Sequence, residues 1–168
     1  QDGEPIQGLR IRTALAPHDD LGSTIFRMEW TRENHAASLG FATDLGYADD
    51  SIIDHLRGVS LLAIESNYCP LLQAASPRPE FLKRRITGGK GHLSNQQALD
   101  LALALHAASP IEQLVLLHLS RQCNHPDVVR ALYRERSPHL ADRLVVTGQH
   151  APAEPVLATP GGHAVALF

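Results

Sequence analysis

Three side chains of the kind that bind metals follow directly on apolar segments of the sequence. His18 comes after "LAP", Asp44 after "FAT" and His118 after "LVLL". Imidazole nitrogen and carboxylate oxygen are suitable ligands for zinc, manganese or iron, and one aspartate can bridge two ions. Sheet enzymes place site residues at strand ends, because the strand fixes the position while the loop leaves access. We therefore predict that these three residues meet in one pocket that holds divalent ions.

Five apolar or alternating segments predict the strands that would position these residues. Residues 9–15 alternate in polarity, and residues 23–30 and 36–43 flank the polar turn "TRENH", which favours a hairpin. Residues 60–65 and 113–120 are more continuously apolar, which is typical of strands buried on both faces. Four of these five segments run into or end on a polar or charged side chain of chemical interest.

The clearest helix is predicted over residues 94–109. Ser94 and Gln97 form a capping box at its start, and its apolar positions make a broad buried stripe. Shorter helices are predicted over 51–58 and 125–136. Strands alternate with helices in this second part of the chain, whereas the first part is rich in strands. That order favours a layered α/β domain.

Two regions of the sequence have weaker patterns. Residues 66–91 contain three prolines and three glycines and predict a long irregular excursion, of the kind that is usually functional or disordered. Near the carboxyl end, residues 142–148 and 154–159 predict closing strands, and 163–168 suggest a third. No internal repeat or low-complexity segment interrupts the chain.

Composition excludes several classes of protein. The chain has 168 residues, enough for one domain with a substantial core. Its formal net charge of −3 gives no overall basic field, so a polyanionic substrate would need a local basic patch. No apolar run approaches the ~18 residues of a membrane-spanning helix, and the polar first residues are no signal peptide. Two cysteines make no disulfide framework, which favours a reducing cytoplasm.

The short sequence motifs around the three residues resemble those of the metallo-β-lactamase-fold hydrolases. "HDD" resembles the third metal motif of that family, "TDLG" its bridging-aspartate motif and "LLHLS" its last histidine motif. The resemblance runs roughly from residue 10 to 150. It implies the C-terminal half of an αββα sandwich, a mixed sheet with flanking helices. It also implies that His18 ligates a first ion, Asp44 bridges both ions and His118 ligates the second, with zinc foremost and manganese or iron as alternatives.

Two further motifs are similar to those of the tRNase Z type of phosphodiesterase. They are "IESNY" (64–68) and "GHLSNQQALDLA" (91–102), and the longer forms resemble a bacterial branch beside tRNase Z with exonuclease activity in some members. By this resemblance, Glu65 and His92 act together on the leaving oxygen, outside the metal shell. The chemistry is consistent: a metal-activated hydroxide attacks phosphorus, and an imidazole that donates to a carboxylate holds its proton longer and can act as general acid. The implied function is that of a metal-dependent phosphodiesterase or nuclease.

Substrate contacts are assigned to residues close to these motifs. The basic cluster at 83–90 lies beside "GHLSN", and we select Arg84 and Lys90 from it as phosphate ligands. Asn67 and Asn95 are candidates for hydrogen bonds to substrate. The alternative for the cluster is a solvated charged face, and for the amides ordinary loop or helix-cap roles.

Other functions remain open at this stage. The same fold and metals suit a small ester, a lactam or a cyclic phosphate as substrate. A non-catalytic module could also bind nucleic acid through the basic cluster alone. Either a nucleic acid or a small phosphodiester is therefore the expected partner, with no membrane involved.

One element of the family pattern is absent from the sequence. No His-x-His-x-Asp-His segment occurs, so each of two ions would have at most two side-chain ligands, whereas catalytic zinc usually has three. We therefore interpret residues 1–168 as a single partial domain, either a C-terminal fragment or a natural shortened protein. We expect the chain alone to be weakly active or inactive, and an exposed sheet face and edge would favour a homodimer.

Overall fold

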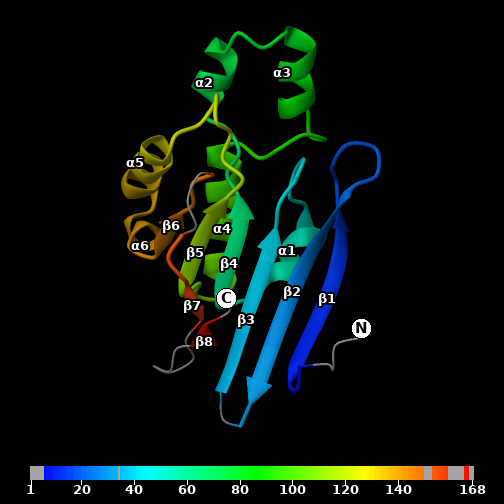
Figure 1. The fold of residues 1–168 in the computed structure, drawn as a ribbon, viewed down its shortest axis with the longest axis vertical. Coiled ribbons are helices and arrows are strands. Elements are labelled where there is room, and N and C mark those ends of the chain that lie inside the picture. Colours follow the sequence, from blue (N-terminus) through cyan, green and yellow to red (C-terminus); the bar gives the residue numbers. More distant parts are fainter. Residues whose placement is uncertain (1–5, 34, 150–152, 159–164, 167–168) are drawn as a thin grey trace.

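A six-stranded mixed sheet forms the centre of the molecule in a computed structural model that describes residues 6–33, 35–149, 153–158 and 165–166. The strands lie side by side in chain order (Figure 1). The sheet consists of β1 (Leu9–Ala16), β2 (Ser23–Arg32), β3 (His35–Ala42), β4 (Leu61–Glu65), β5 (Gln113–Leu117) and β6 (Leu144–Val146).

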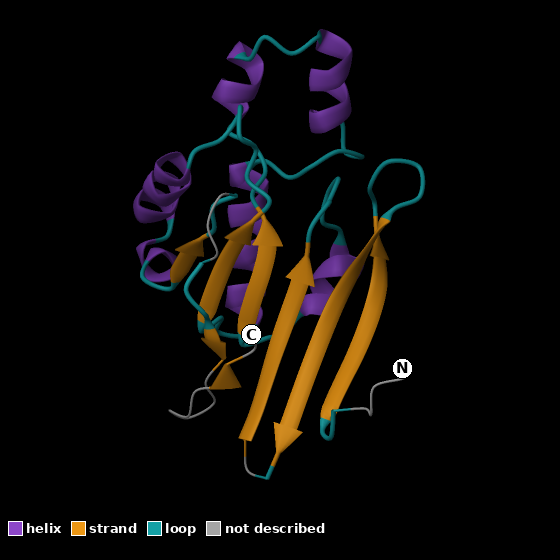
Figure 2. Ribbon diagram, in the orientation of Figure 1, coloured by secondary structure: helices purple, strands orange, loops and turns teal. Residues whose placement is uncertain are grey.

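Strand directions bring several strand ends to one edge of the sheet. β2 is antiparallel to both β1 and β3, while β3, β4, β5 and β6 are parallel to one another. β1 therefore runs in the same direction as β3. The carboxyl ends of β1, β3, β4 and β5 all lie at the edge drawn at the top of Figure 2, so residues that follow these strands share one region of space.

The helices divide into a layer behind the sheet and an excursion beyond its edge. Figure 1 shows α2 and α3 above the carboxyl ends of the strands, apart from the layer that contains α1 and α4. None of the helices in the described part of the chain combines the length and apolarity that a bilayer crossing requires. The helices are α1 (Asp50–Leu56), α2 (Pro70–Ala75), α3 (Glu80–Thr87), α4 (Asn95–Ala108), α5 (Pro126–Arg136) and α6 (Pro138–Ala141).

Alternation along β4 divides the apolar residues between two faces. Leu62 and Ile64 belong to the larger core under the helices, whereas Leu61 and Ala63 belong to a smaller cluster on the opposite face. This is the pattern expected for a strand that is buried on both sides. The helices contribute to the larger core through Ile52, Leu56, Leu99, Leu105, Val129, Tyr133 and Leu140, among others.

The opposite face of the sheet is covered more thinly. Partly buried side chains such as Met28, Phe41 and Leu117 pack around the small cluster there. A second sheet of two antiparallel strands, β7 (Leu157–Ala158) and β8 (Val165–Ala166), lies near this region, and Val156 packs against the cluster. The mixed sheet with flanking helices agrees with the architecture predicted from the sequence.

The prediction of an irregular excursion over residues 66–91 was wrong in part. The segment contains α2 and α3, and two of its three prolines stand at the starts of these helices rather than interrupt them. Pro70 occupies the first turn of α2, and Pro79 stands at the N-cap of α3. A proline is tolerated at the start of a helix because its missing N–H would have had no partner there.

The other predicted elements are present with small shifts of their ends. The capping box of Ser94 and Gln97 starts α4 as expected, and Pro126 begins α5. Of the predicted strands over 154–159 and 163–168, the described residues contain β7 and β8, and residue 159 lies outside them. The remaining residues of the last segment, 163–164 and 167–168, lie outside the described residues.

Candidate active site

Asp44 lies at the centre of a group of three imidazoles. Its Oδ1 is 3.8 Å from His18 Nε2, 3.7 Å from His92 Nδ1 and 3.6 Å from His118 Nδ1. The centroid of the His92 ring is 5.1 Å from that of His18 and 5.1 Å from that of His118. The structure thus brings His18, Asp44 and His118 together at the sheet edge, although they are far apart along the chain.

Each of the three imidazoles is held by its Nδ1 atom. His18 Nδ1 lies 2.8 Å from the carbonyl oxygen of Gly91, and the Nδ1 atoms of His92 and His118 each lie 3.1 Å from Glu65 Oε2. A carbonyl and a carboxylate can only accept, so each Nδ1 must carry the proton. In the neutral rings, Nε2 then has the free electron pair, which is the arrangement that metal-binding histidines usually show.

Glu65 is a fully buried carboxylate, and the backbone of two neighbouring loops donates to it. Its Oε1 accepts from the N–H groups of Leu45 (2.9 Å) and Leu93 (2.8 Å), and its Oε2 accepts from the N–H of Asp44 (3.1 Å). The exposed fraction of Glu65 is 0%. Because a carboxylate has about four sites for hydrogen bonds, these donors and the two imidazoles saturate it, and Glu65 serves to hold the rings and loops in place.

The same contacts determine the electrostatics of the pair formed by Glu65 and its imidazoles. Burial alone would raise the pKa of Glu65, but hydrogen bonds from His118, His92 and the Leu93 N–H outweigh it and lower the pKa to about 2. The hydrogen bond to Glu65 raises the pKa of His118, against an opposing effect of desolvation. Glu65 therefore stays ionised and stabilises positive charge on the ring beside it.

Backbone conformation at the strand ends is unusual. Asp19, Asp44 and His118 have positive φ angles of 43°, 59° and 56°. Few residues other than glycine adopt this region, although Asp and His are enriched among them, and such strain concentrates at functional sites. The turn after β3 also needs a glycine, because a Cβ on Gly46 would stand 2.1 Å from the carbonyl oxygen of Gly89. These turns aim the side chains of Asp44 and His118 toward the group.

A buried network of amides connects the loops under the site. Asn95 Nδ2 donates to Asn124 Oδ1 (2.9 Å), while Asn95 Oδ1 accepts from Ser66 Oγ (2.7 Å) and Asn124 Nδ2 (2.8 Å). Asn124 Nδ2 also lies 2.7 Å from the carbonyl oxygen of Ser66 and 3.0 Å from that of Asn67. Asn95 is therefore buried and fully bonded beneath the loops, in place of the substrate contact expected for it.

Replacing Asn124 with alanine is expected to destabilise the fold by about 2–3 kcal/mol, because it leaves buried carbonyl and amide groups without partners. Urea unfolding followed by circular dichroism measures the change. Gln96→Ala is a suitable control, since this side chain bonds only to the exposed Asp100 of the same helix, and we expect a change within about 0.5 kcal/mol. A loss below about 1 kcal/mol in Asn124→Ala would contradict the structural role of the network.

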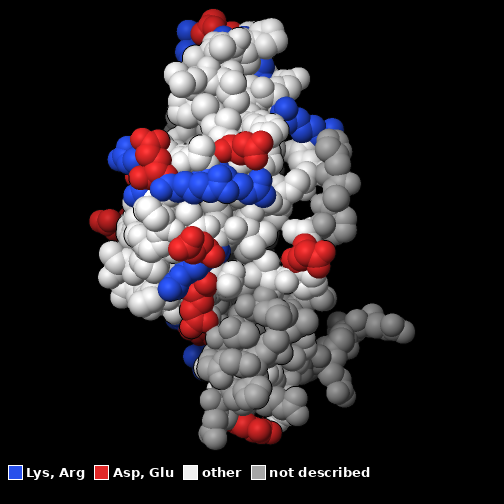
Figure 3. All heavy atoms as spheres, turned by 90° about the vertical axis from the view of Figure 1, so that its left-hand side faces the viewer, with Lys and Arg blue, Asp and Glu red and all other residues white. Residues whose placement is uncertain are grey.

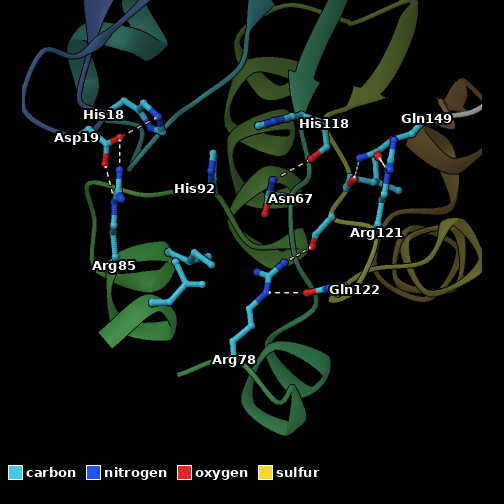
Figure 4. Close-up of a pocket in the computed structure, with 14 residues that line it drawn as sticks. His18, Asp19, Asn67, Arg78, Arg85, His92, His118, Arg121, Gln122 and Gln149 are labelled. Atoms are coloured by element: carbon cyan, nitrogen blue, oxygen red, sulfur yellow. Dashed lines mark hydrogen bonds and ion pairs between the residues drawn. The ribbon is translucent and has the colours of Figure 1, made fainter. Parts of the chain in front are cut away.

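The imidazoles form the floor of an open cleft of about 610 Å³. Figure 4 shows His18, His92 and His118 along it, with Asn67 beside His118. Asn67 Nδ2 donates to the carbonyl oxygen of His118 at 2.9 Å, so Asn67 does reach the cleft. Its walls come from α3 with the segment before it, from the loop after β5 and from the segment after β6. The residues on them include Arg78, Arg85, Ser120, Arg121, Gln122 and Gln149.

Two of the predicted substrate ligands lie elsewhere. Arg84 and Lys90 line a separate hollow beside Asp19 and Asp20, and Lys90 Nζ lies 3.5 Å from Asp20 Oδ1. Arg78 and Arg121, which the sequence patterns did not single out, line the cleft instead. Arg121 stands three residues after His118, in the loop that follows β5. This position next to a predicted metal ligand is the feature of the sequence that could have indicated its place in the cleft.

The group of side chains has the composition of a metal site. Asp44, Glu65, His92 and His118 each offer a ligand atom, and these atoms lie within 4.8 Å of one another. His18 Nε2 faces the same carboxylate from the other side. Since Glu65 is saturated by its own hydrogen bonds, the residues that fit metal ions best are Asp44 and the imidazoles, through nitrogen atoms with free electron pairs.

The fold of the chain is similar to that of a solved structure. The chain superposes on zinc-bound PqqB from Methylobacterium extorquens with a TM-score of 0.54 and 15% identity, over 86% of this chain and 50% of that one. A second structure is that of a diphosphatase from the PhnP family, with a TM-score of 0.49 and 14% identity over 85% of this chain and 42% of that one. The chain has the metallo-β-lactamase fold, in part of its full extent.

Sequence comparison adds one curated relative. Exodeoxyribonuclease YycJ from Bacillus anthracis is 29% identical over 103 residues, which are 61% of this chain and 39% of that protein. The chain therefore spans well under two thirds of the length of the proteins that it matches. No protein-family model matches the chain.

Proposed function

We propose that this site takes part in the metal-dependent hydrolysis of phosphodiester bonds in nucleic acid. The observation that carries the proposal is the arrangement of three imidazoles, each anchored through Nδ1, around one carboxylate on the floor of a cleft. Similarity to a protein named exodeoxyribonuclease supports nucleic acid as the substrate.

Two divalent ions are proposed as cofactors, zinc foremost and manganese or iron as alternatives. The residues that would hold them are His18, Asp44 and His118, with Asp44 between the two sites. When bound, such ions neutralise charge on a phosphate and lower the pKa of a coordinated water toward neutrality. Zinc is also the ion named for the PqqB structure.

His92 is proposed as the general acid. Its Nδ1 is engaged with Glu65, and its ring lines the cleft, so Nε2 is the atom that would pass a proton to the leaving oxygen of the substrate. Glu65 would hold the ring through Nδ1 and keep it oriented for this transfer. Asn67, at the same end of the cleft, would hydrogen-bond to a phosphate oxygen.

The domain is proposed to be one part of a larger catalytic unit. Its three proposed ligands give each of two ions at most two side chains, whereas three are usual for catalytic zinc. We propose that further ligands come from another polypeptide segment and that the 168 residues alone are weakly active or inactive. The hydrolytic activity is therefore proposed for the gene product that contains these residues, and not for these residues alone.

Turnover assays on that gene product test the proposal. With zinc or manganese present, we expect hydrolysis of bis-p-nitrophenyl phosphate and shortening of a labelled DNA strand, and we expect a metal chelator to remove both activities. Nitrocefin, a lactam, serves as the competing substrate. Turnover of nitrocefin without cleavage of either phosphodiester would refute the nuclease function and favour a small-molecule hydrolase.

A further inference from the structure

Arg78 is held in the wall of the cleft by neutral groups. Its Nε donates to Gln122 Oε1 at 3.1 Å, and its terminal nitrogens donate to Gln73 Oε1 and Ser120 Oγ at 3.3 Å each. A guanidinium has five N–H donors, so these contacts fix its position and leave donors for a ligand. Figure 4 shows Arg78 with its bond to Gln122.

Arg121 is held in a similar way on the loop after β5, which also carries Ser120 and Gln122. Its Nε donates to Gln149 Oε1, and Gln149 Nε2 donates in turn to the carbonyl oxygen of Leu119 at 2.6 Å. Among the described residues, neither terminal nitrogen of Arg121 has a hydrogen-bond partner, so both can bind a ligand. Among those residues, neither Arg78 nor Arg121 has a carboxylate as an ion-pair partner.

The predicted basic cluster is different, because carboxylates offset most of its charge. Arg85 forms two hydrogen bonds with Asp19, at 2.8 and 3.1 Å. Lys83 Nζ lies 3.1 Å from Glu80 Oε1, and Lys90 pairs with Asp20. Uncompensated positive charge in the cleft is therefore concentrated on Arg78 and Arg121 rather than on the cluster at 83–90.

Figure 3 shows the side that carries α5 and α6, where Lys and Arg side chains lie close to Asp and Glu side chains. A net charge of −3 likewise gives no overall attraction for a polyanion. Binding of a nucleic-acid backbone would thus depend on the two cleft arginines, since phosphate contacts supply most of the affinity.

The position of the two arginines relative to His118 suits a neighbouring phosphate. Ser120, which binds Arg78, is two residues from His118, and Arg121 is three residues away. Two residues of extended chain span at most about 7 Å. A strand in a helix carries one phosphate for each rise of about 3.4 Å along the axis. Since both arginines and the imidazoles line the same cleft, a strand with one phosphate at the imidazoles would bring a neighbouring phosphate toward these arginines.

We propose that Arg78 and Arg121 form a phosphate-binding wall for a polynucleotide strand, which makes the substrate an oligonucleotide rather than an isolated phosphodiester. This inference rests on the proposed function. A guanidinium grips phosphate with two parallel hydrogen bonds, so the arginines position the strand while the reacting bond lies at the imidazoles. They are positioning residues that act mainly on long substrates.

Fluorescence anisotropy with a labelled oligothymidylate, without added metal, tests this wall directly in the chain. Arg78→Gln and Arg121→Gln are each expected to weaken binding about tenfold and to lower the salt dependence by about one phosphate contact. The control is Arg134→Gln, an exposed arginine on α5 away from the cleft, which should leave both quantities unchanged. Circular dichroism reports whether each variant is folded. If Arg78→Gln proves unstable, Arg121→Gln still tests the wall, because it removes no buried contact.

A second readout separates this inference from the proposed function. In the active gene product, both variants should raise KM for the oligonucleotide by a much larger factor than KM for bis-p-nitrophenyl phosphate. Unchanged oligonucleotide binding in both variants, or no binding by the parent chain, overturns the wall even if the small ester is hydrolysed. Loss of binding in the variants without hydrolysis of any phosphodiester by the parent supports the wall and refutes the proposed function instead.

Discussion

Asp44→Asn is expected to lower the affinity for zinc at least ~100-fold and to reduce phosphodiester hydrolysis by a similar or larger factor. Among the described residues, Asp44 Oδ1 is the one carboxylate oxygen that lies within 4 Å of all three imidazoles. An amide in its place offers a neutral oxygen and cannot offset the repulsion of two cations that share a ligand. The effect should therefore fall on metal binding itself and not only on turnover.

Asparagine is the suitable replacement because of the backbone at this position. Asp44 has φ of 59°, a conformation that asparagine and aspartate tolerate better than most residues. Its N–H donates to Glu65 Oε2, and its carbonyl oxygen accepts from Ser23 Oγ at 2.7 Å. Both contacts use main-chain atoms and persist in the variant, so the loop should keep its shape.

Competition with a chromogenic chelator measures the zinc affinity, and bis-p-nitrophenyl phosphate reports the hydrolysis. Asp54→Asn is the matched control, since that carboxylate is on α1 and largely exposed, and it should bind zinc as the parent does. If Asp44→Asn binds zinc with unchanged affinity and remains folded, Asp44 is no metal ligand, and the proposed ion-binding site loses its central residue.

Residues at strand ends could be predicted from the sequence because a simple rule applies to them. His18, Asp44 and His118 each follow an apolar segment, and parallel strands bring their carboxyl ends to one edge. Because β2 is antiparallel to both β1 and β3, β1 runs in the same direction as β3, which brings His18 to that edge as well. Apolar patterning thus contains most of the information about where these side chains meet.

Contacts made by main-chain atoms could not be predicted in the same way. The sequence motif associated Glu65 with His92, but the second imidazole, His118, and the N–H donors of Leu45 and Leu93 depend on the path of two loops. The positive φ of His118 is also invisible to propensity, because histidine adopts this region only when surrounding contacts require it. Tertiary packing determines these features.

Charge pairing explains why the basic cluster was a poor guide to the cleft. Counting lysines and arginines along residues 83–90 ignores the carboxylates that fold against them, such as Asp19 beside Arg85. Arg78 and Arg121 stand alone in the sequence and gain significance only because their neighbours in space are glutamines and a serine. Net charge at a site depends on spatial pairs, which periodicity does not report.

Glu65→Gln is expected to destabilise the fold by about 3 kcal/mol at neutral pH, and Glu65→Ala by about 3–5 kcal/mol. Alanine leaves the N–H groups of Asp44, Leu45 and Leu93 without an acceptor inside the protein. Glutamine keeps one carbonyl oxygen for some of these donors but removes the charge beside the imidazoles. Glu80→Gln, in an exposed pair on α3, is the control and should change stability by less than about 0.5 kcal/mol.

The stabilisation by Glu65 should disappear in acid. Its pKa is lowered from 4.5 to about 2 in the folded protein, so the folded state resists protonation of this group more than the unfolded chain does. The contribution is therefore complete above about pH 4.5 and declines as the pH falls toward 2, with a total of about 3 kcal/mol. By about pH 3, roughly 2 kcal/mol of it should be gone.

Urea unfolding of the parent and of Glu65→Gln at about pH 5 and about pH 3 isolates this contribution from that of other acids. Both proteins lose stability from carboxylates such as Asp19 and Asp49, whose pKa values are also lowered in the folded state. Only the parent loses the part due to Glu65, so its decline should exceed that of the variant by about 2 kcal/mol. Equal declines would mean that Glu65 is not ionised against its imidazoles, and His92 would then lack the partner that its proposed role as general acid requires.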